Sequence, residues 1–200
     1  MKTAATEVWF APGRANLMGE HTDYNEGFVL PFALAQGVTA SVCARGDERL
    51  VLRSKQVPAD LVTVSLDALA PGAVTGWAAY PAGVAWSLRT AGHAVRGASI
   101  DVDSDLPVGA GVSSSAALEC SVALALCSLS GLSVPRPQLA RIAKRASLSA
   151  TSVSVSVVEI ASDNVAERVT DRMRGKRMRT VTVRAARFAF RRRPATRSAR

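Results

Sequence analysis

A run of glycines and polar side chains near the start of the sequence is suited to bind a ligand rich in hydroxyl groups. Its functional side chains are Arg14, Glu20, His21, Thr22 and Asp23. Carboxylates accept hydrogen bonds from hydroxyl groups, and the histidine with its neighbouring hydroxyl and amide groups would orient the ligand further. Arg14 is suited to a different task, holding charge on a phosphoryl group. A metal site is disfavoured, because adjacent residues seldom face one cation and no second histidine or cysteine lies nearby in the sequence.

A second cluster, of small residues and serines, precedes a long apolar stretch. It consists of Gly109, Ala110, Gly111, Val112, Ser113, Ser114 and Ser115. Glycines let backbone N–H groups approach an anion, and the N-terminus of a following helix adds partial positive charge. A serine hydroxyl here would either cap the helix or reach a phosphate-bound Mg²⁺. The pattern is neither Walker A nor GxGxxG, so the residues alone leave a phosphate cradle and a serine-capped helix equally open.

Short alternating and longer periodic apolar segments must position these two clusters. We expect strands at 7–10, 37–45, 49–53, 61–66 and 97–103, and helices at 77–90, 116–130 and 138–146. Ala11-Pro12-Gly13 indicates a turn after the first strand, and Gly46 with Asp47 indicates a hairpin between the second and third. Strands first, followed by mixed helices, favour an α+β fold.

The chain changes composition near residue 146. Of its 200 residues, the first 145 carry 12 basic and 12 acidic side chains, whereas the last 55 carry 13 basic and 4 acidic ones. The whole net charge of +9 therefore lies in the last segment. We assign one domain to residues 1–146 and interpret residues 147–200 as an arginine-rich tail, disordered or read out of frame.

The remaining composition bears on the compartment. The three cysteines form no CxxC pair, which favours a reducing cytoplasm, with each thiol as a small buried hydrophobe. No apolar run reaches the roughly 18 residues of a membrane helix, and the first ten residues do not read as a signal peptide. We therefore expect a cytoplasmic protein with no membrane partner.

Both clusters resemble motifs of one enzyme family. The run Gly13-Arg14-x-Asn16-Leu17-x-Gly19-Glu20-His21-Thr22-Asp23-Tyr24-Asn25 is similar to the galactokinase signature, and Leu106–Glu119 resembles the second motif of the GHMP kinase superfamily that contains it. The likeness extends from about Glu7 to Ala146. It implies an N-terminal domain similar to the second domain of ribosomal protein S5. It also implies a ferredoxin-like C-terminal domain, which we do not find in this sequence.

The resemblance implies transfer of the γ-phosphate of ATP to the 1-hydroxyl of galactose. By similarity, galactose would be bound by Glu20, His21, Thr22 and Asp23. Arg14 would stabilise the transferring phosphoryl group, and Gly109 to Ser115 would enclose the ATP phosphates, with Ser115 reaching Mg²⁺. Ser54 would lie near the nucleotide. Trp77 would lie near the adenine, although a core position on a helix face is an equally good interpretation.

The sequence departs from the family after Ala146. Ser147 and Leu148 stand where galactokinases carry Glu-Asn, whose glutamate binds Mg²⁺, and a Ser-Val alternation replaces the glycine-rich stretch before the catalytic aspartate. By register that aspartate would fall on Glu159, whose neighbours do not rebuild the motif. We therefore expect impaired turnover, and both a damaged galactokinase and a non-catalytic galactose- or ATP-binding remnant stay open.

A frameshift near codon 147 is our hypothesis for the tail, because a GC-rich gene read out of frame yields an excess of arginine, serine, alanine and valine. The rival is a basic arm that binds nucleic acid through phosphate contacts. We rank it lower, since the tail contains no recognisable nucleic-acid-binding motif.

Overall fold

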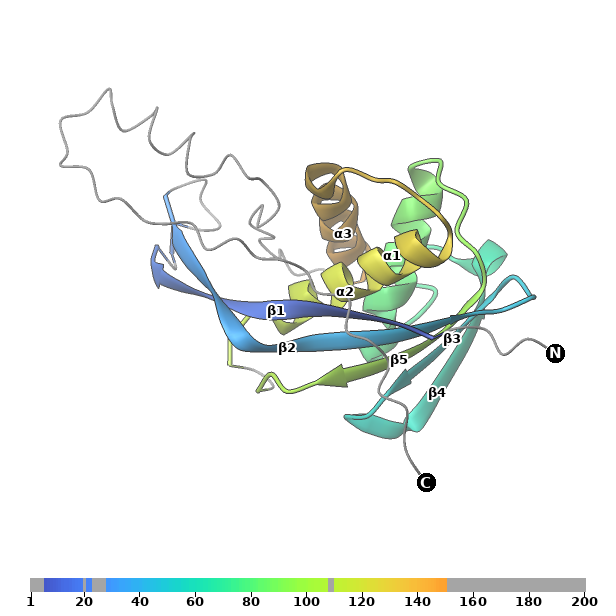
Figure 1. Cartoon of the computed structure of the whole chain (residues 1–200), viewed down its shortest axis with the longest axis horizontal. Helices are drawn as coiled ribbons and strands as arrows, with labels where there is room; N and C mark the ends of the chain where they lie inside the picture. The colour runs from blue at the N-terminus through green and yellow to red at the C-terminus, as the bar shows by residue number, and fades with distance from the viewer. Residues whose placement is uncertain (1–5, 20, 23–27, 108–109, 151–200) are drawn as a thin grey trace.

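The computed structural model describes residues 6–19, 21–22, 28–107 and 110–150, with the backbone alone for 147–150. One sheet forms one layer, and the α-helices pack together on one of its faces (Figure 1). This is the predicted α+β class. In chain order the elements are β1 (Glu7–Met18), β2 (Leu30–Ala44), β3 (Arg49–Ser54), β4 (Val57–Ser65), the 3₁₀ helices η2 (Leu66–Ala68) and η3 (Gly76–Ala78), α1 (Ala79–Thr90), β5 (Ala98–Ser104), α2 (Ser114–Leu129) and α3 (Arg136–Ala150).

The strands follow the order β1-β2-β5-β3-β4, so β5 lies between β2 and β3. It pairs antiparallel with β2 and parallel with β3. The predicted hairpin between segments 37–45 and 49–53 is therefore wrong. The turn residues identified from the sequence instead cross the start of β5, where the Arg45 backbone N–H donates to the Gly97 carbonyl at 2.9 Å. Local turn signals cannot report a strand that inserts from far along the chain.

The first strand is also longer than predicted. The segment Ala11-Pro12-Gly13 does not end it, and β1 continues to Met18 in antiparallel pairing with β2. Register shifts after Pro12 and after Asn16 interrupt the ladder. Proline, which has no N–H to donate, is tolerated here because β1 is an edge strand and the ladder is irregular. As a result, β1 and β2 project well beyond the end of β5 (Figure 1).

The core lies between the sheet and the helices. Helix α2 is apolar around most of its circumference because it packs against β1, β2, α1 and α3. Its Val122 and Leu126 are fully buried, as are Val42 and Leu52 of the sheet. In the described part of the chain, no helix combines the length and the apolar character needed to cross a bilayer.

The helix boundaries agree closely with the periodicity. Helix α1 ends as predicted before Gly92, which adopts φ +87° and lets the His93 N–H donate to the Leu88 carbonyl at 3.0 Å. Helix α3 starts two residues before the predicted Gln138 and passes the predicted end at Ala146 to reach Ala150. Ala146 itself is fully buried, so the helix stays packed on the core at that point.

Candidate functional site

Strand ends bring the first part of the site together. Because β3 and β5 run parallel, their last residues lie at the same edge of the sheet, with Ser54 opposite Val102. From Ser104 the chain leaves β5 and enters the glycine- and serine-rich loop. Asp105 ties the beginning of this loop to β2, since its carboxylate accepts a hydrogen bond from the Gly37 N–H at 2.6 Å. The predicted nucleotide residue and the predicted phosphate loop are thus held by adjacent strands.

The loop then returns to the first strand. The Arg14 backbone N–H donates to the Val112 carbonyl at 3.0 Å, close to the bulge in β1. The Arg14 residue is 7% exposed, which is unusual for an arginine. Arg14 of the first cluster and Val112 of the second are about a hundred residues apart in sequence. They therefore meet in space.

The start of α2 carries an unusual backbone conformation. Ser113 has φ +58°, and it is the one non-glycine residue with positive φ among those the structure describes. Its side chain makes no capping hydrogen bond, so the serine-capped interpretation of the loop does not hold at this position. Such conformations cost about 1–3 kcal/mol and concentrate at ligand sites.

The strained turn leaves hydrogen-bond donors at the helix start. The first helical bond of α2 runs from the Ala117 N–H to the Ser113 carbonyl at 3.0 Å. The backbone N–H groups of Ser114, Ser115 and Ala116 precede it and have no partner within the helix. Gly111, at φ +68°, turns the loop in a conformation that side-chain-bearing residues rarely adopt. An anion is the ligand that such a helix N-terminus favours.

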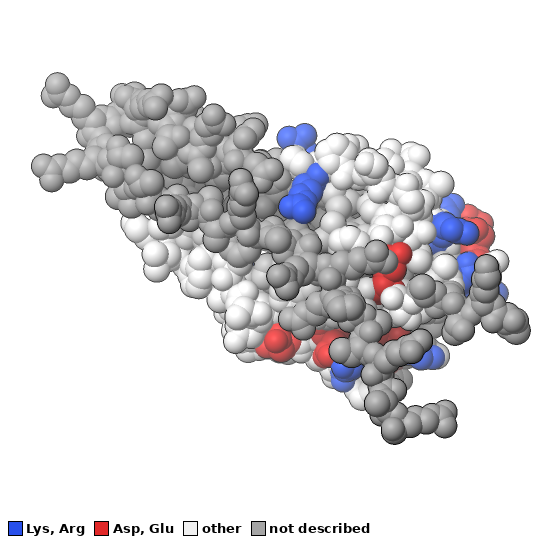
Figure 2. Space-filling view, in the orientation of Figure 1, with Lys and Arg blue, Asp and Glu red and all other residues white. Residues whose placement is uncertain are grey.

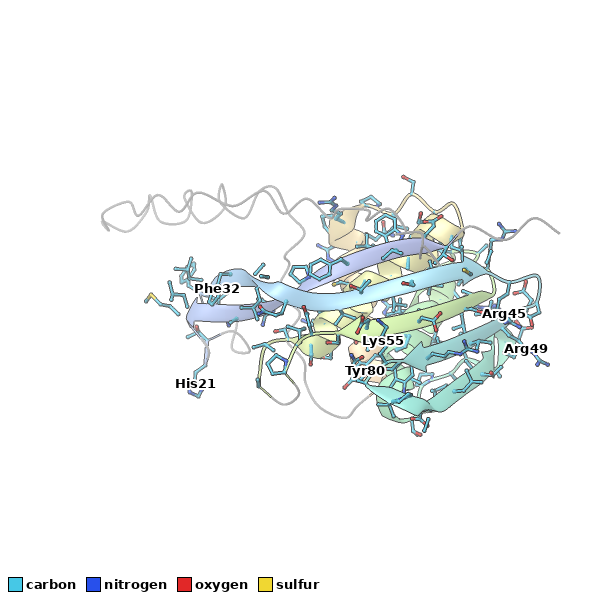
Figure 3. All side chains as sticks on the ribbon, turned by 60° about the horizontal axis from the view of Figure 1, so that its bottom comes forward. His21, Phe32, Arg45, Arg49, Lys55 and Tyr80 are labelled. Carbon is cyan, nitrogen blue, oxygen red and sulfur yellow. The ribbon has the colours of Figure 1, made fainter. Side chains whose placement is uncertain are left out.

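His21 and Thr22 lie in the turn after β1, at the far end of β1 and β2. His21 is exposed at this end of the molecule, on the opposite side from Arg45 and Arg49 (Figure 3). Thr22 closes the turn after β1, since its hydroxyl lies 3.0 Å from the Gly19 carbonyl and 2.7 Å from the Phe28 carbonyl. The Thr22 hydroxyl hydrogen is therefore engaged by the backbone of this turn, and the assignment of Thr22 to galactose stays a prediction. Three further predicted residues, Glu20, Asp23 and Gly109, lie outside the described residues.

A hydrogen-bond network that was not predicted surrounds Ser54. The Ser54 hydroxyl lies 3.2 Å from the Gln56 side-chain oxygen and 3.3 Å from the Gln56 backbone N–H. The Gln56 amide nitrogen reaches Asp103 at 3.2 Å and the Ser104 carbonyl at 2.8 Å. The sequence does not predict Asp103 as part of this site, because register across the sheet cannot be read from one strand.

The pKa of the carboxyl group in this network is lowered, whereas the pKa values of two cysteine thiols are raised. The Lys55 ammonium donates to the Asp103 carboxylate at 2.5 Å and holds the pKa of that carboxyl below its usual range. Burial raises the pKa of Cys120 to about 12 and that of Cys127 to about 11. Both thiols therefore stay protonated at neutral pH and are unsuited as nucleophiles or metal ligands.

The described surface carries charges of both signs (Figure 2). On the face that Figure 2 draws, the described residues carry basic and acidic side chains in small separate groups, in keeping with the charge balance of the first 145 residues. Trp77 in η3 packs partly buried against the core, and its indole N–H has no hydrogen-bond partner among the described residues. Its placement accommodates both the core and the base-contact interpretation.

Comparison with known proteins shows which proteins this chain is similar to. Residues 2–44 match the model described as the galactokinase galactose-binding signature, and residues 79–162 match the GHMP kinases N-terminal domain. The galactokinase of Streptomyces coelicolor is 52% identical over 139 residues, which are 70% of this chain and 36% of that protein. Over these residues the chain is similar to galactokinases. The galactokinase of Thermotoga maritima is 39% identical over 149 residues, 74% of this chain and 41% of the relative.

Solved structures agree with the fold. Lactococcus lactis galactokinase complexed with galactose superposes with a TM-score of 0.74 at 32% identity, covering 80% of this chain and 42% of that one. The mevalonate kinase of Methanococcus jannaschii, at 14% identity and a TM-score of 0.64, shares the fold alone. The chain thus spans well under half the length of the curated relatives it matches. The resemblance drawn from the two motifs is confirmed.

Proposed function

We propose that this chain forms the part of a galactokinase that binds galactose and ATP, for transfer of the γ-phosphate of ATP to the 1-hydroxyl of galactose. The carrying observation is the hydrogen bond between the Arg14 N–H and the Val112 carbonyl. It holds an arginine of the galactose-binding signature against the loop at the start of α2. A sugar kinase needs this juxtaposition, because the attacking hydroxyl and the phosphoryl group must meet in one place.

The donor side of the site is the N-terminus of α2. Its first backbone N–H groups, which have no partner within the helix, together with the helix dipole and the glycine-containing loop before it, favour the polyphosphate of ATP. The positive φ of Ser113 turns the chain so that this helix start is left uncapped. Arg14, whose guanidinium stays charged at any physiological pH, would neutralise charge that develops on the transferring phosphoryl group.

The acceptor side is the turn between β1 and β2. His21 is exposed there, and we assign galactose hydroxyls to it together with Glu20 and Asp23. Thr22 holds this turn closed through its bonds to Gly19 and Phe28. The Lactococcus relative, whose structure was solved with galactose, supports the choice of sugar.

The described residues do not form a metal site by themselves. No group of three or more histidine, cysteine or acidic residues is close enough together among them to hold an ion. Ser115 offers one hard hydroxyl oxygen at the helix start, whereas Mg²⁺ usually needs carboxylates and substrate phosphates in addition. We therefore place Mg²⁺ with ATP rather than with the free chain. The unpaired cysteines favour the cytoplasm as the compartment.

Turnover is expected to be low. The sequence has serine at 147 in place of the family's metal-binding glutamate and does not rebuild the aspartate motif around Glu159, which lies outside the described residues. Loss of a general base alone lowers rates by about 10²–10⁴-fold. The chain would then bind both reactants while phosphorylating galactose slowly or not at all.

Calorimetric titration of the full chain with galactose, and separately with Mg²⁺ and ATP, tests the proposal. The protein is prepared from a host lacking galactokinase, and the formation of galactose 1-phosphate is assayed in parallel. Arg14→Met should weaken ATP binding, whereas Arg45→Met, at the opposite end of the sheet, should not. Failure of the wild-type chain to bind either reactant would contradict the function. Turnover at an ordinary kinase rate would contradict the expected impairment only.

A further inference from the structure

The network around Gln56 determines how its side-chain amide is oriented. One end of the amide lies within hydrogen-bond distance of the Asp103 carboxylate and the Ser104 carbonyl, at 3.2 and 2.8 Å. Both of these groups are acceptors only, so the Gln56 NH₂ group must face them and uses its two hydrogens there. The Gln56 carbonyl oxygen is consequently the atom that faces Ser54.

The ion pair at the base of the network keeps this orientation in place. Lys55 binds the second oxygen of Asp103 at 2.5 Å, and the carboxyl pKa lies below its usual range because of that bond. Asp103 therefore remains an ionised acceptor across the neutral range. A protonated Asp103 could offer a donor and permit the amide to turn over, whereas the carboxylate does not.

The orientation of Gln56 in turn decides what Ser54 can offer a ligand. The single hydrogen of the Ser54 hydroxyl is donated to the Gln56 oxygen at 3.2 Å, and one lone pair accepts from the Gln56 backbone N–H at 3.3 Å. One lone pair is left. Ser54 is 8% exposed, so this lone pair is the polar feature that it can present to a bound molecule.

We propose that Gln56 is a positioning residue that makes the Ser54 hydroxyl a hydrogen-bond acceptor for the nucleoside part of the bound nucleotide. The inference rests on the proposed function, since it takes Ser54 as a nucleotide contact. Ionised phosphate oxygens carry no hydrogen and cannot bind this lone pair. Its partner must be a donor, which in ATP is the adenine amino group or a ribose hydroxyl.

Position in the fold supports this assignment. Ser104 accepts from Gln56 through its carbonyl, and its hydroxyl accepts from the Leu106 N–H at 3.3 Å. Leu106 begins the loop that leads to α2. The network thus spans the end of β3, the end of β5 and the base of the phosphate loop, where a nucleoside attached to those phosphates would lie.

Nucleotide affinity of Ser54→Ala, Gln56→Leu and the double variant tests the proposal, measured calorimetrically on the full chain with Mg²⁺ and ATP. Each single variant should lose roughly 2- to 10-fold in affinity, the usual weight of one hydrogen bond. Because Gln56 acts through Ser54, the double variant should be no weaker than Ser54→Ala. Galactose affinity should stay unchanged throughout.

Matched controls separate positioning from folding. Asp103→Asn should weaken ATP binding, whereas Asp47→Asn should not, although Asp47 is also an exposed carboxylate held by a cation, Arg45 at 2.7 Å. Inosine triphosphate, which lacks the amino group, and the 2′- and 3′-deoxy forms of ATP identify the donor. The analogue that lacks it should bind more weakly and be insensitive to Ser54→Ala.

The outcomes are distinguishable. Binding of ATP that is insensitive to Ser54→Ala, or sensitive to Ser54→Ala but not to Gln56→Leu, would overturn the inference and leave the proposed function standing. Equal affinity for ATP and all three analogues would also overturn it. Absence of any ATP binding by the wild-type chain would overturn the proposed function itself.

Discussion

Replacement of Gly97 even by alanine should destabilise the fold, because the backbone of residues 47–49 crosses directly over it. An added Cβ would overlap the Asp47 carbonyl oxygen and would lie 2.9 Å from the Asp47 carbonyl carbon and 3.1 Å from the Arg49 oxygen. All three atoms belong to the backbone, so no change of rotamer can relieve the overlap. The crossing segment between β2 and β3 would have to move away from the start of β5.

The cost follows from what that movement breaks. Overpacking of a well-packed site costs about 1–3 kcal/mol. Displacement also strains the 2.9 Å bond from the Arg45 N–H to Gly97, and a typical hydrogen bond contributes about 1 kcal/mol. We expect Gly97→Ala to lower the free energy of unfolding by about 2–4 kcal/mol, a large share of the ~5–15 kcal/mol of an ordinary domain.

Urea denaturation followed by tryptophan fluorescence measures this loss, and Gly46→Ala is the matched control. Gly46 lies in the same crossing, yet an added Cβ there meets nothing within 4 Å and its φ is not positive. Its replacement should change stability by less than about 1 kcal/mol. Equal urea midpoints for the two variants would refute the insertion of β5 beneath this crossing.

Two further predictions concern the thiols and the surface. With folded pKa values of about 12 and 11, Cys120 and Cys127 should resist iodoacetamide at pH 8 in the folded chain, as mass spectrometry of alkylated peptides would show. Folding raises both thiol pKa values, so the two thiols contribute their full stabilisation below the ordinary thiol pKa. This stabilisation is lost as the pH rises toward 11–12. A urea midpoint that stays constant from pH 9 to 12 would contradict the prediction. Leu17, Met18, Phe28 and Phe32 are 46–70% exposed, and replacing them with serine should reduce self-association in light scattering, whereas serine at the equally exposed Leu61 of β4, 57% exposed, should have a smaller effect.

The sequence predicted most elements because their signals are local. The helical spacing that predicts a helix at 77–90 is a property of neighbouring residues, and the structure places α1 at Ala79–Thr90, directly after the 3₁₀ helix that contains Trp77. The failures arise where a distant strand decides the outcome. Pro12 indicates a turn by itself, yet pairing with β2 carries β1 through it, since an edge strand tolerates a missing donor.

The site divides in the same way. Arg14 and the loop ending at Ser115 were predicted from residue type, spacing and the family resemblance. Gln56 and Asp103 were not, because they lie 47 positions apart in the chain and meet only through the parallel pairing of β3 with β5. Thr22 was assigned to the sugar, and the structure shows its hydroxyl engaged by the turn that holds the sugar-binding end together.

We therefore expect binding and turnover to depend on different parts of the sequence. The start of α2, Arg14 and the Ser54 network, to which we assign ATP binding, are all positioned by one sheet and the helices on one of its faces, within the first 150 residues. All of these contacts are made by described residues before the departure from the family pattern that we infer after Ala146. If the sheet alone positions the ligands, truncation after Ala150 should leave galactose and ATP affinities within about 2-fold of the full chain. A loss of both affinities on truncation would show that residues 151–200 support the site. That result would contradict our assignment of the binding domain to residues 1–146.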